Sequence, residues 1–296
     1  MEWTECLKRA INYMEENLLK NISAENVARE VNLSSFYLQK GFKIMTGYSI
    51  SEYIRYRRLY LAALDVIADT EKVIELAYKY GYEAPESFTK AFSRFHGVSP
   101  MQMKGDASKI KTFLPLKISV VVQGGNDMDY VVEKMRGFQV IGFAREFAFE
   151  SSYQEIPKFW NEFCEKYCRP QVSGKEKSQT EQVICDCRVG EYGVCIDDLD
   201  TEGKFRYLIA GTYTGGEVPE GMTVYEFPDM EWAKFRCVGS MPGALQAVNT
   251  KVFREWLPGN PEYEIAVGAN IEWYSKGDTA SADYESAIWI PVKRKK

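Results

Sequence analysis

A short segment near residue 90 carries polar side chains that can hydrogen-bond to the edges of nucleic acid bases. In residues 85–96, apolar side chains recur at positions i, i+3, i+4 and i+7 from Phe88, which is the spacing of one buried helix face. Lysine and arginine on the other face can donate to guanine or to phosphate oxygens. The same pattern is equally typical of a helical hairpin with a solvated face. The outward positions are Glu86, Thr89, Lys90 and Arg94.

A second copy of this segment lies fifty residues earlier. Residues 46–49 correspond to residues 96–99, and each copy places a glycine two residues before a serine. Asn32 takes the turn position of Gly81, and asparagine is the next best residue for left-handed backbone geometry. Residues 51–69 between the copies predict one long helix. Two helix-turn-helix units in tandem favour DNA binding.

The first copy has its own set of outward side chains. Gln39 can make two hydrogen bonds to adenine, Lys40 can donate to guanine, and Phe36 can contact a thymine methyl group. Leu38 and Phe42 are expected to point inward. The outward positions of the first predicted recognition helix are Ser35, Phe36, Gln39, Lys40 and Lys43.

The charge distribution agrees with a nucleic acid partner, although the net charge of −5 does not by itself. Residues 1–105 hold 14 Lys and Arg against 13 Asp and Glu. From Ser34 to Arg58 there are five cations and one acid, which forms a basic stripe. We expect three arginines of this stripe to bind phosphates, which gives affinity without sequence preference. They are Arg55, Arg57 and Arg58.

Residues 5–105 resemble the DNA-binding domain of the AraC/XylS family of transcription activators. The likeness rests on "YIRYRRL" in the long helix and on "GYEAPESFTKAFSRFHGVSPMQMK". Asn32 departs from the family's usual glycine. The resemblance implies a monomer whose two recognition helices enter successive major grooves of an asymmetric double-stranded DNA site. It also implies RNA polymerase as a further partner.

Composition excludes several other classes of protein. The 296 residues can form two domains, and no apolar run is long enough to span a membrane. Seven cysteines, an odd number, and an amphipathic N-terminus without a signal sequence predict a cytoplasmic protein without a disulfide framework. Cys164 and Cys168 lack zinc-site spacing, and His96, the one histidine, is expected to pack or cap a helix. No metal or cofactor is expected.

The second part of the chain predicts a different architecture. Residues 106–117 are polar and aperiodic, which indicates a linker between a domain of residues 1–105 and one of residues 118–296. Residues 155–167 resemble residues 249–259, and strand-like segments follow both. The fold class is therefore α+β: an all-α tandem helix-turn-helix domain, followed by two βαββ repeats that form an antiparallel sheet with two helices.

Aromatic and acidic side chains of this part suit an organic cation. Trp160 and Trp256 hold near-equivalent places in the two repeats and could flank a groove at the pseudo-twofold axis. Acids on the neighbouring strands, Asp197, Glu272 and Glu285, could line it. Ring faces and a carboxylate together attract cations. The alternative is that most of these rings are core. The candidate ligand-binding residues are Glu272, Glu285, Trp160, Trp256, Phe163, Tyr192 and Tyr274.

Residues 117–292 resemble the GyrI-like effector-binding domain of multidrug regulators. The likeness rests on "IPKFWNEF", "FREWLP", "IEWY" and "DYESAIWIPV". It implies that a central glutamate among aromatic rings binds lipophilic cations. Glu272 fits that position best and Glu285 second. "GSMPGALQAVN" departs from the family's usual aromatic-rich start of the second helix.

These patterns predict a transcription regulator that acts as an activator and is not an enzyme. Its second domain is predicted to sense a small molecule. Two alternatives stay open. The domain could be a hydrolase in which Glu272 is the general base with a tyrosine such as Tyr192 nearby. It could also be a protein-interaction module that binds no ligand.

Overall fold

The structure is a computed structural model that describes residues 3–69, 71–118, 128–168, 178–198 and 203–295. It contains two compact units. In so far as they are described, one contains residues 3–33 and 46–122, and the other contains residues 34–45 and 123–296. We call them the helical unit and the sheet unit. Neither contains a described helix that is long and apolar enough to cross a membrane.

Serines and left-handed residues set the ends of the helices in the helical unit. Ser49 and Ser99 each accept a hydrogen bond from the backbone N–H three residues on, which caps the next helix. Gly97 ends the preceding helix at φ +81°, so the repeated Gly-x-Ser is a stop followed by a start. Asn32 has φ +55°, close to the +80° of Gly81, as predicted. The helices are α1 (Trp3–Glu16), α2 (Ala24–Glu30), α4 (Ile50–Ala68), α5 (Val73–Lys79), α6 (Pro85–His96), α7 (Pro100–Gly105) and a short 3-10 turn, η1 (Ala107–Lys109).

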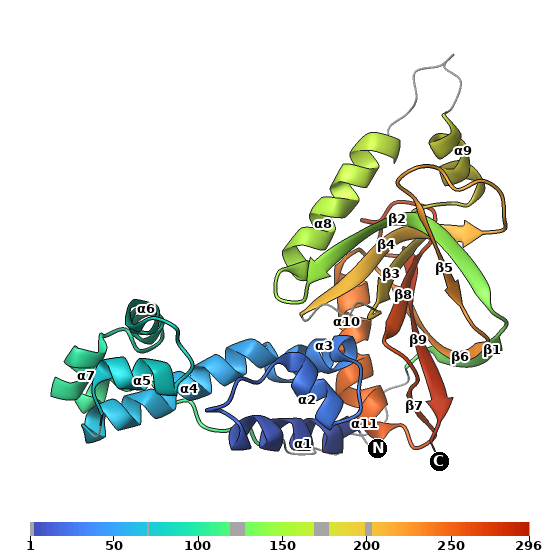
Figure 1. The fold of residues 1–296 in the computed structure, drawn as a ribbon. Coiled ribbons are helices and arrows are strands. Elements are labelled where there is room, and N and C mark those ends of the chain that lie inside the picture. Colours follow the sequence, from blue (N-terminus) through green and yellow to red (C-terminus); the bar gives the residue numbers. More distant parts are fainter. Residues whose placement is uncertain (1–2, 70, 119–127, 169–177, 199–202, 296) are drawn as a thin grey trace. The chain divides into compact units, whose positions relative to one another are not determined.

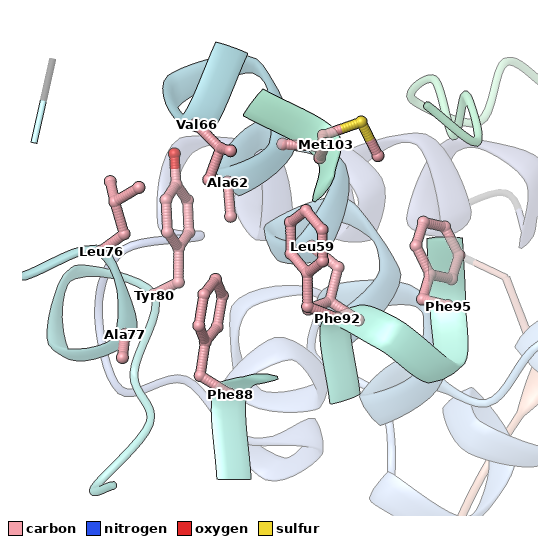
Figure 2. Packing of buried hydrophobic residues seen from close by; sticks show 11 residues of the cluster. Leu59, Ala62, Val66, Leu76, Ala77, Tyr80, Phe88, Phe92, Phe95 and Met103 are labelled. Atoms are coloured by element: carbon pink, nitrogen blue, oxygen red, sulfur yellow. The ribbon is translucent and has the colours of Figure 1, made fainter. Parts of the chain in front are cut away.

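The aromatic stripe of α6 forms the core of the second helix-turn-helix. Phe88 and Phe92 are fully buried, and Phe95 is nearly so. The three rings belong to one core cluster with Leu59 of α4 and Met103 of α7, and Figure 2 shows Phe92 beside Leu59. Burying an aromatic side chain stabilises the fold by about 2–3 kcal/mol, so this stripe fixes how α6 packs. The helical period read from the sequence is confirmed.

The predicted linker packs against the helical unit. Residues 110–118 form neither helix nor strand. The Phe113 ring lies 5.2 Å from Tyr48 and 5.5 Å from Tyr56 in edge-to-face contacts. The His96 ring accepts from the Lys111 N–H and contacts the Leu59 carbonyl, so His96 packs between segments as expected. The start of this segment is therefore held in place by aromatic contacts.

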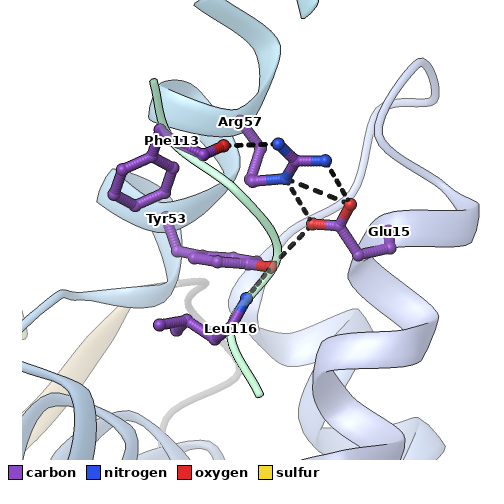
Figure 3. A network of polar contacts seen from close by, with 5 residues as sticks. All are labelled: Glu15, Tyr53, Arg57, Phe113 and Leu116. Atoms are coloured by element: carbon purple, nitrogen blue, oxygen red, sulfur yellow. Dashed lines mark hydrogen bonds and ion pairs between the residues drawn. The ribbon is translucent and has the colours of Figure 1, made fainter. Parts of the chain in front are cut away.

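An ion pair ties α1 to α4, and it corrects one sequence prediction. The Arg57 guanidinium donates to both carboxylate oxygens of Glu15 and to the Phe113 carbonyl, and the Tyr53 hydroxyl donates to Glu15 (Figure 3). Burial opposes the charge of Arg57, but the hydrogen bonds and charge of Glu15 outweigh it and raise the pKa of Arg57. Arg57 is only 5% exposed. The expectation that it faces phosphates is wrong in this structure, because Glu15 engages its guanidinium.

The sheet unit contains one antiparallel sheet of nine strands (Figure 1). The strand order is β1-β6-β9-β8-β3-β4-β2-β5, with β7 paired to β9. Trp232 of β6 lies 5.3 Å from Phe227 of β5 and 6.0 Å from Phe138 of β2. These strands stand toward opposite ends of the order, so the sheet curls around an apolar core. The strands are β1 (Tyr130–Met135), β2 (Phe138–Ala148), β3 (Tyr192–Ile196), β4 (Lys204–Tyr213), β5 (Thr223–Phe227), β6 (Met230–Val238), β7 (Tyr263–Ile265), β8 (Ala269–Tyr274) and β9 (Glu285–Arg294).

The two predicted βαββ repeats are confirmed, and β3 and β8 join them at the middle of the sheet. Each repeat has a helix that ends in a π-helical turn, α8 with η2 in the first and α10 with η3 in the second. The unit also contains α3, although this helix comes from the N-terminal part of the chain. The helices are α3 (Ser35–Thr46), α8 (Ser152–Phe163), η2 (Cys164–Cys168), α9 (Gln179–Asp186), α10 (Gly243–Lys251), η3 (Val252–Trp256) and α11 (Leu257–Gly259).

We expect Arg57→Ala to lower the free energy of unfolding by about 2–3 kcal/mol, because it leaves a largely buried carboxylate without its partner. Urea unfolding of the full chain, followed by far-ultraviolet circular dichroism, measures this. Arg9→Ala is the control. Its pair with Glu30 is 3.4 Å long and partly exposed, so its loss should cost below about 0.5 kcal/mol. Equal losses for the two variants would contradict the structural role of the Arg57 pair.

Candidate functional site

A carboxylate lies near the middle of the sheet, under aromatic rings. Glu272 and Tyr274 alternate with Ile271 and Trp273 along β8, so they share one face. The Tyr274 hydroxyl donates to the Glu272 carboxylate at 2.7 Å. The Trp160 ring of α8 stands edge-on to Tyr274, with the ring centroids 5.4 Å apart. The prediction that Glu272 shares its face with Tyr274 is confirmed.

A hydrogen-bond chain extends from α8 to this carboxylate. The Trp160 indole N–H donates to the Tyr207 hydroxyl at 2.8 Å. Tyr207 is also hydrogen-bonded to Tyr274, which donates to Glu272. We call Trp160, Tyr207, Glu272 and Tyr274 the Glu272 cluster.

A glycine makes room for this chain. Gly193 of β3 lies directly opposite Glu272 of β8. A Cβ at Gly193 would stand 2.2 Å from the Tyr207 hydroxyl and 3.3 Å from a Glu272 oxygen. Any side chain here would displace Tyr207 or separate the strands. The sequence analysis missed both Gly193 and Tyr207, because only the strand register brings them beside Glu272.

The surroundings keep the phenols and the thiol protonated and leave the carboxylate as the negative group. Burial first, and then the charge of Glu272, raise the pKa of Tyr274 and of Tyr207 well above the usual value. The same two causes raise the pKa of the buried Cys195 thiol. A protonated thiol is a poor nucleophile. The cluster therefore offers a hydrogen-bonded carboxylate among rings, an arrangement that can attract a cation.

Other predicted ligand residues lie elsewhere. Trp256 is 6% exposed and packs against Tyr130 and Phe235, at 5.5 and 5.0 Å. It therefore belongs to a separate aromatic group, and the two tryptophans do not flank Glu272 symmetrically. Glu285 is exposed and forms an ion pair with Arg236. Neither residue is brought to the Glu272 cluster.

Tyr192 also departs from the expectation. It neighbours Gly193 along β3, so it points to the other face, where its ring lies 5.8 Å from Trp289 and its hydroxyl 3.3 Å from Thr212. The general-base pair of Glu272 and Tyr192 is therefore not assembled. Phe163 is buried and lies 6.1 Å from the Trp160 ring, so it supports the cluster.

The predicted DNA-facing residues of α6 lie on its outer face. Glu86, Lys90 and Arg94 are exposed and Thr89 is half-buried, while Phe88 and Phe92 point inward. In the described part of the chain, no carboxylate forms an ion pair with Lys90 or Arg94. These two cations are thus accessible to a polyanion.

The equivalent residues of α3 and the stripe arginines are placed differently. Phe36 is 4% and Gln39 9% exposed, so the expectation that both point outward is wrong in this structure. Ser35, Lys40 and Lys43 are half-buried. On α4, Arg55 is exposed, as expected of a phosphate ligand. Arg58 donates to the Leu18 and Lys20 carbonyls, which holds its guanidinium inside the helical unit.

Comparison with known proteins assigns the chain to a protein family. The family model of the integron-associated effector-binding proteins (Cass2) matches residues 132–292, more than half of the chain. The chain belongs to this family. A helix-turn-helix domain model matches residues 27–105. The resemblance of the first part to AraC-type DNA-binding domains and of the second to effector-binding domains is thereby confirmed.

Curated relatives match mainly the helical part. The Tn10 TetD protein of Escherichia coli is 32% identical over 97 residues, which cover 33% of this chain and 70% of TetD. The multiple antibiotic resistance protein MarA of Escherichia coli is 32% identical over 90 residues, covering 30% and 71%. The transcriptional regulator YbfP of Bacillus subtilis is 27% identical over 150 residues, covering 51% and 46%. The chain thus spans about half the length of YbfP.

Two solved structures each match just over half of this chain. The protein SAV2435 bound to tetraphenylphosphonium is 25% identical, with a TM-score of 0.45, over 56% of this chain and 94% of that chain. An integron cassette protein of Vibrio cholerae is 18% identical, with a TM-score of 0.38, over 55% and 95%.

We expect Gly193→Ala to lower the free energy of unfolding by about 1–3 kcal/mol, because the new methyl group collides with the Tyr207 hydroxyl. Urea unfolding measures the change. Gly243→Ala is the matched control: it opens α10, and nothing lies within 4 Å of its Cβ position. Because alanine favours helix over glycine, this control should be neutral or slightly stabilising. An unchanged free energy of unfolding in Gly193→Ala would mean that the Glu272 cluster is less tightly packed than described.

Proposed function

We propose that this protein is a DNA-binding transcription regulator whose sheet unit binds a lipophilic organic cation at Glu272. The observation that carries the ligand assignment is the Glu272 carboxylate, which accepts from the Tyr274 hydroxyl while the Tyr274 ring packs edge-on against Trp160. A family that binds effectors and an AraC-type helix-turn-helix domain support the regulatory part.

The charge balance of the cluster favours a cationic ligand over a neutral one. Among the four side chains, Glu272 is the only one that can be charged near neutral pH, because the pKa of both tyrosines is raised. The Tyr274 hydroxyl donates one hydrogen bond to the Glu272 carboxylate, and a carboxylate can accept several, so its oxygens keep acceptor capacity. A half-buried carboxylate attracts a cation more strongly than one in water, since the effective dielectric is lower. Aromatic rings add cation–π attraction.

The DNA assignment rests on the outer face of α6. Lys90 and Arg94 project there without an acidic partner among the described residues, and Thr89 precedes Lys90 on the helix. An arginine can bind guanine through two parallel hydrogen bonds, and a lysine can donate to guanine or to phosphate. We infer that α6 reads one major groove and that α3 reads the next. Because the two helices differ in sequence, the site is asymmetric. Activation, with RNA polymerase as partner, is the regulatory outcome we propose.

We expect Glu272→Gln to weaken binding of tetraphenylphosphonium at least tenfold, or about 1.4 kcal/mol, because the substitution removes the counter-charge and keeps the shape. Isothermal titration calorimetry measures this affinity. Triphenylphosphine oxide, which is neutral, should bind the two proteins alike. Glu285→Gln is the control variant and should bind the cation like the wild type. Equal cation affinity in wild type and Glu272→Gln would refute the counter-charge role.

We expect Lys90→Ala and Arg94→Ala each to weaken binding to a duplex, selected from a random pool by the full chain, by about 1–3 kcal/mol. The loss follows from the removal of a donor to a base or phosphate. Fluorescence anisotropy at several salt concentrations measures both the affinity and its salt dependence. Lys293→Ala removes the same charge from β9 in the sheet unit and is the control. If all three variants bind equally, α6 is not the reading helix.

A further inference from the structure

The first recognition helix is anchored on the sheet unit at its N-terminal end. The Phe36 backbone N–H donates to an Asp197 carboxylate oxygen at 2.9 Å. Asp197 follows β3 directly, and its own N–H donates to the Gly268 carbonyl. The first N–H groups of a helix lack partners within the helix, and a negative charge at this end is favourable. Asp197, an acid that the sequence suggested could line the groove, caps α3.

Side chains of α3 extend this anchor into the sheet unit. The Tyr37 hydroxyl donates to the Ala269 carbonyl at 2.5 Å, and Tyr37 is fully buried. The Phe36 ring lies 5.4 Å from Phe205 and 6.0 Å from Phe149. Together these contacts bury the side chains at the start of the helix. The burial of these two aromatic side chains contributes strongly to the stability of the contact between α3 and the sheet unit.

The other end of α3 is held as well. The Arg254 guanidinium of η3 donates to the Ile44 carbonyl at 3.0 Å, where it satisfies a carbonyl at the C-terminal end of the helix. Lys43 lies over the Tyr153 ring, with its nitrogen 5.0 Å from the ring centroid. Contacts along the whole length of α3 are thus made with the sheet unit.

These contacts involve the face of α3 that we expect to read DNA. Phe36 and Gln39 are buried, and Lys43 is engaged by Tyr153. A side chain that is less than a tenth exposed cannot contact a base edge at the same time. Docking of α3 on the sheet unit and its insertion in a major groove are therefore mutually exclusive.

The docked helix and the Glu272 cluster are held by the same two strands: Tyr37 contacts the carbonyl of Ala269, which begins β8, and Asp197 follows β3. The charge of Glu272 contributes to raising the pKa of Cys195, whereas the charge of Lys40 opposes that rise. The charge of Glu272 likewise contributes to raising the pKa of Tyr153, over which Lys43 lies. The contacts of α3 and the carboxylate that would hold the effector thus lie on the same β3–β8 pair. A cation bound at Glu272 would add positive charge to the surface that holds α3, and this helix carries Lys40 and Lys43, so it would be repelled.

We propose that the sheet unit has a second ligand, the recognition helix α3 of its own chain, and that a cationic effector at Glu272 releases this helix to DNA. The surface that holds α3 is formed by Asp197, Phe205, Ala269 and Arg254. Without effector, α3 is docked and only α6 reads DNA. With effector, both helices are free to read successive grooves. The direction of this control rests on the proposed function, whereas the docking itself rests on the contacts above.

A reversible cross-link tests the docking. A Cβ at Gly268 would stand 2.8 Å from the Cβ atoms of both Ser34 and Asp197, closer than the usual disulfide separation of about 3.5–4.5 Å, so the backbone must shift outward to accept the link. In the double variant Ser34→Cys with Gly268→Cys, oxidation should lock α3 onto the sheet unit. On a duplex selected with the reduced double variant, we expect at least tenfold weaker binding after oxidation, a footprint shortened to one groove, and recovery with dithiothreitol. Each single variant should be insensitive to oxidation. Equal affinity and equal footprint of the oxidised and reduced double variant would overturn the proposal.

A substitution that loosens the helix gives an independent measure. Asp197→Ala removes the acceptor at the start of α3, so DNA binding should become at least threefold tighter than in Asp198→Ala. The control removes the same charge one residue later, where Asp198 pairs with Arg206 at 3.1 Å. If Asp197→Ala binds DNA no better than the control, α3 is not held back by this contact.

An experiment with the cation tetraphenylphosphonium tests this inference separately from the proposed function. Tetraphenylphosphonium should tighten DNA binding of the wild type and leave the oxidised double variant unchanged. If calorimetry shows no binding of the cation, the proposed effector is wrong, while the cross-link still decides whether α3 docks. If the cation binds but DNA affinity stays the same in the wild type, the release of α3 by the effector is wrong.

Discussion

The pairing of β3 with β8 is the constraint on which the candidate site depends. This antiparallel pair joins the two βαββ repeats, and its register sets Gly193 directly opposite Glu272. The missing side chain on one strand leaves the space that Tyr207 and the carboxylate fill on the same face. A shift of the register by one residue would turn Glu272 to the apolar face of the curled sheet. The sheet and the site are therefore specified by the same hydrogen bonds.

A half-buried carboxylate is costly unless other groups compensate its loss of water. Here Tyr274 supplies one hydrogen bond, and its ring packs edge-on against Trp160, which in turn donates to Tyr207. The compensation is partial, because the Tyr274 hydroxyl is the one donor to this carboxylate among the described residues. Such a site gains more from binding a cation than a fully paired carboxylate would. The same arrangement that costs stability thus favours a ligand.

The two helix-turn-helix copies show how similar sequences acquire different surroundings. In α6 the apolar stripe is buried in the core of the helical unit, and the polar face is left to solvent. In α3 the residues at the corresponding outward positions include an aromatic side chain, Phe36, which packs against Phe205. An exposed phenylalanine on a recognition helix is available to any apolar surface nearby. The chemical difference between the copies is small, yet it decides which face of the helix is covered.

The sequence alone determined the periodic features of this protein. The stripe of Phe88 and Phe92, the left-handed turn at Asn32 and the repeated Gly-x-Ser ends follow from local backbone and helix geometry, so both helix-turn-helix copies could be read directly. The two βαββ repeats and the shared face of Glu272 and Tyr274 follow from strand alternation.

Only the tertiary structure decided which distant residues meet. Tyr207 and Gly193 reach Glu272 through strand register, Trp256 and Tyr192 are carried away from it, and Arg57 is turned inward by Glu15. None of these outcomes is contained in a local pattern, because each depends on a contact between segments 42 to 126 residues apart. Local geometry repeats along the chain and can be read from spacing, whereas long-range pairing depends on the packing of the whole unit.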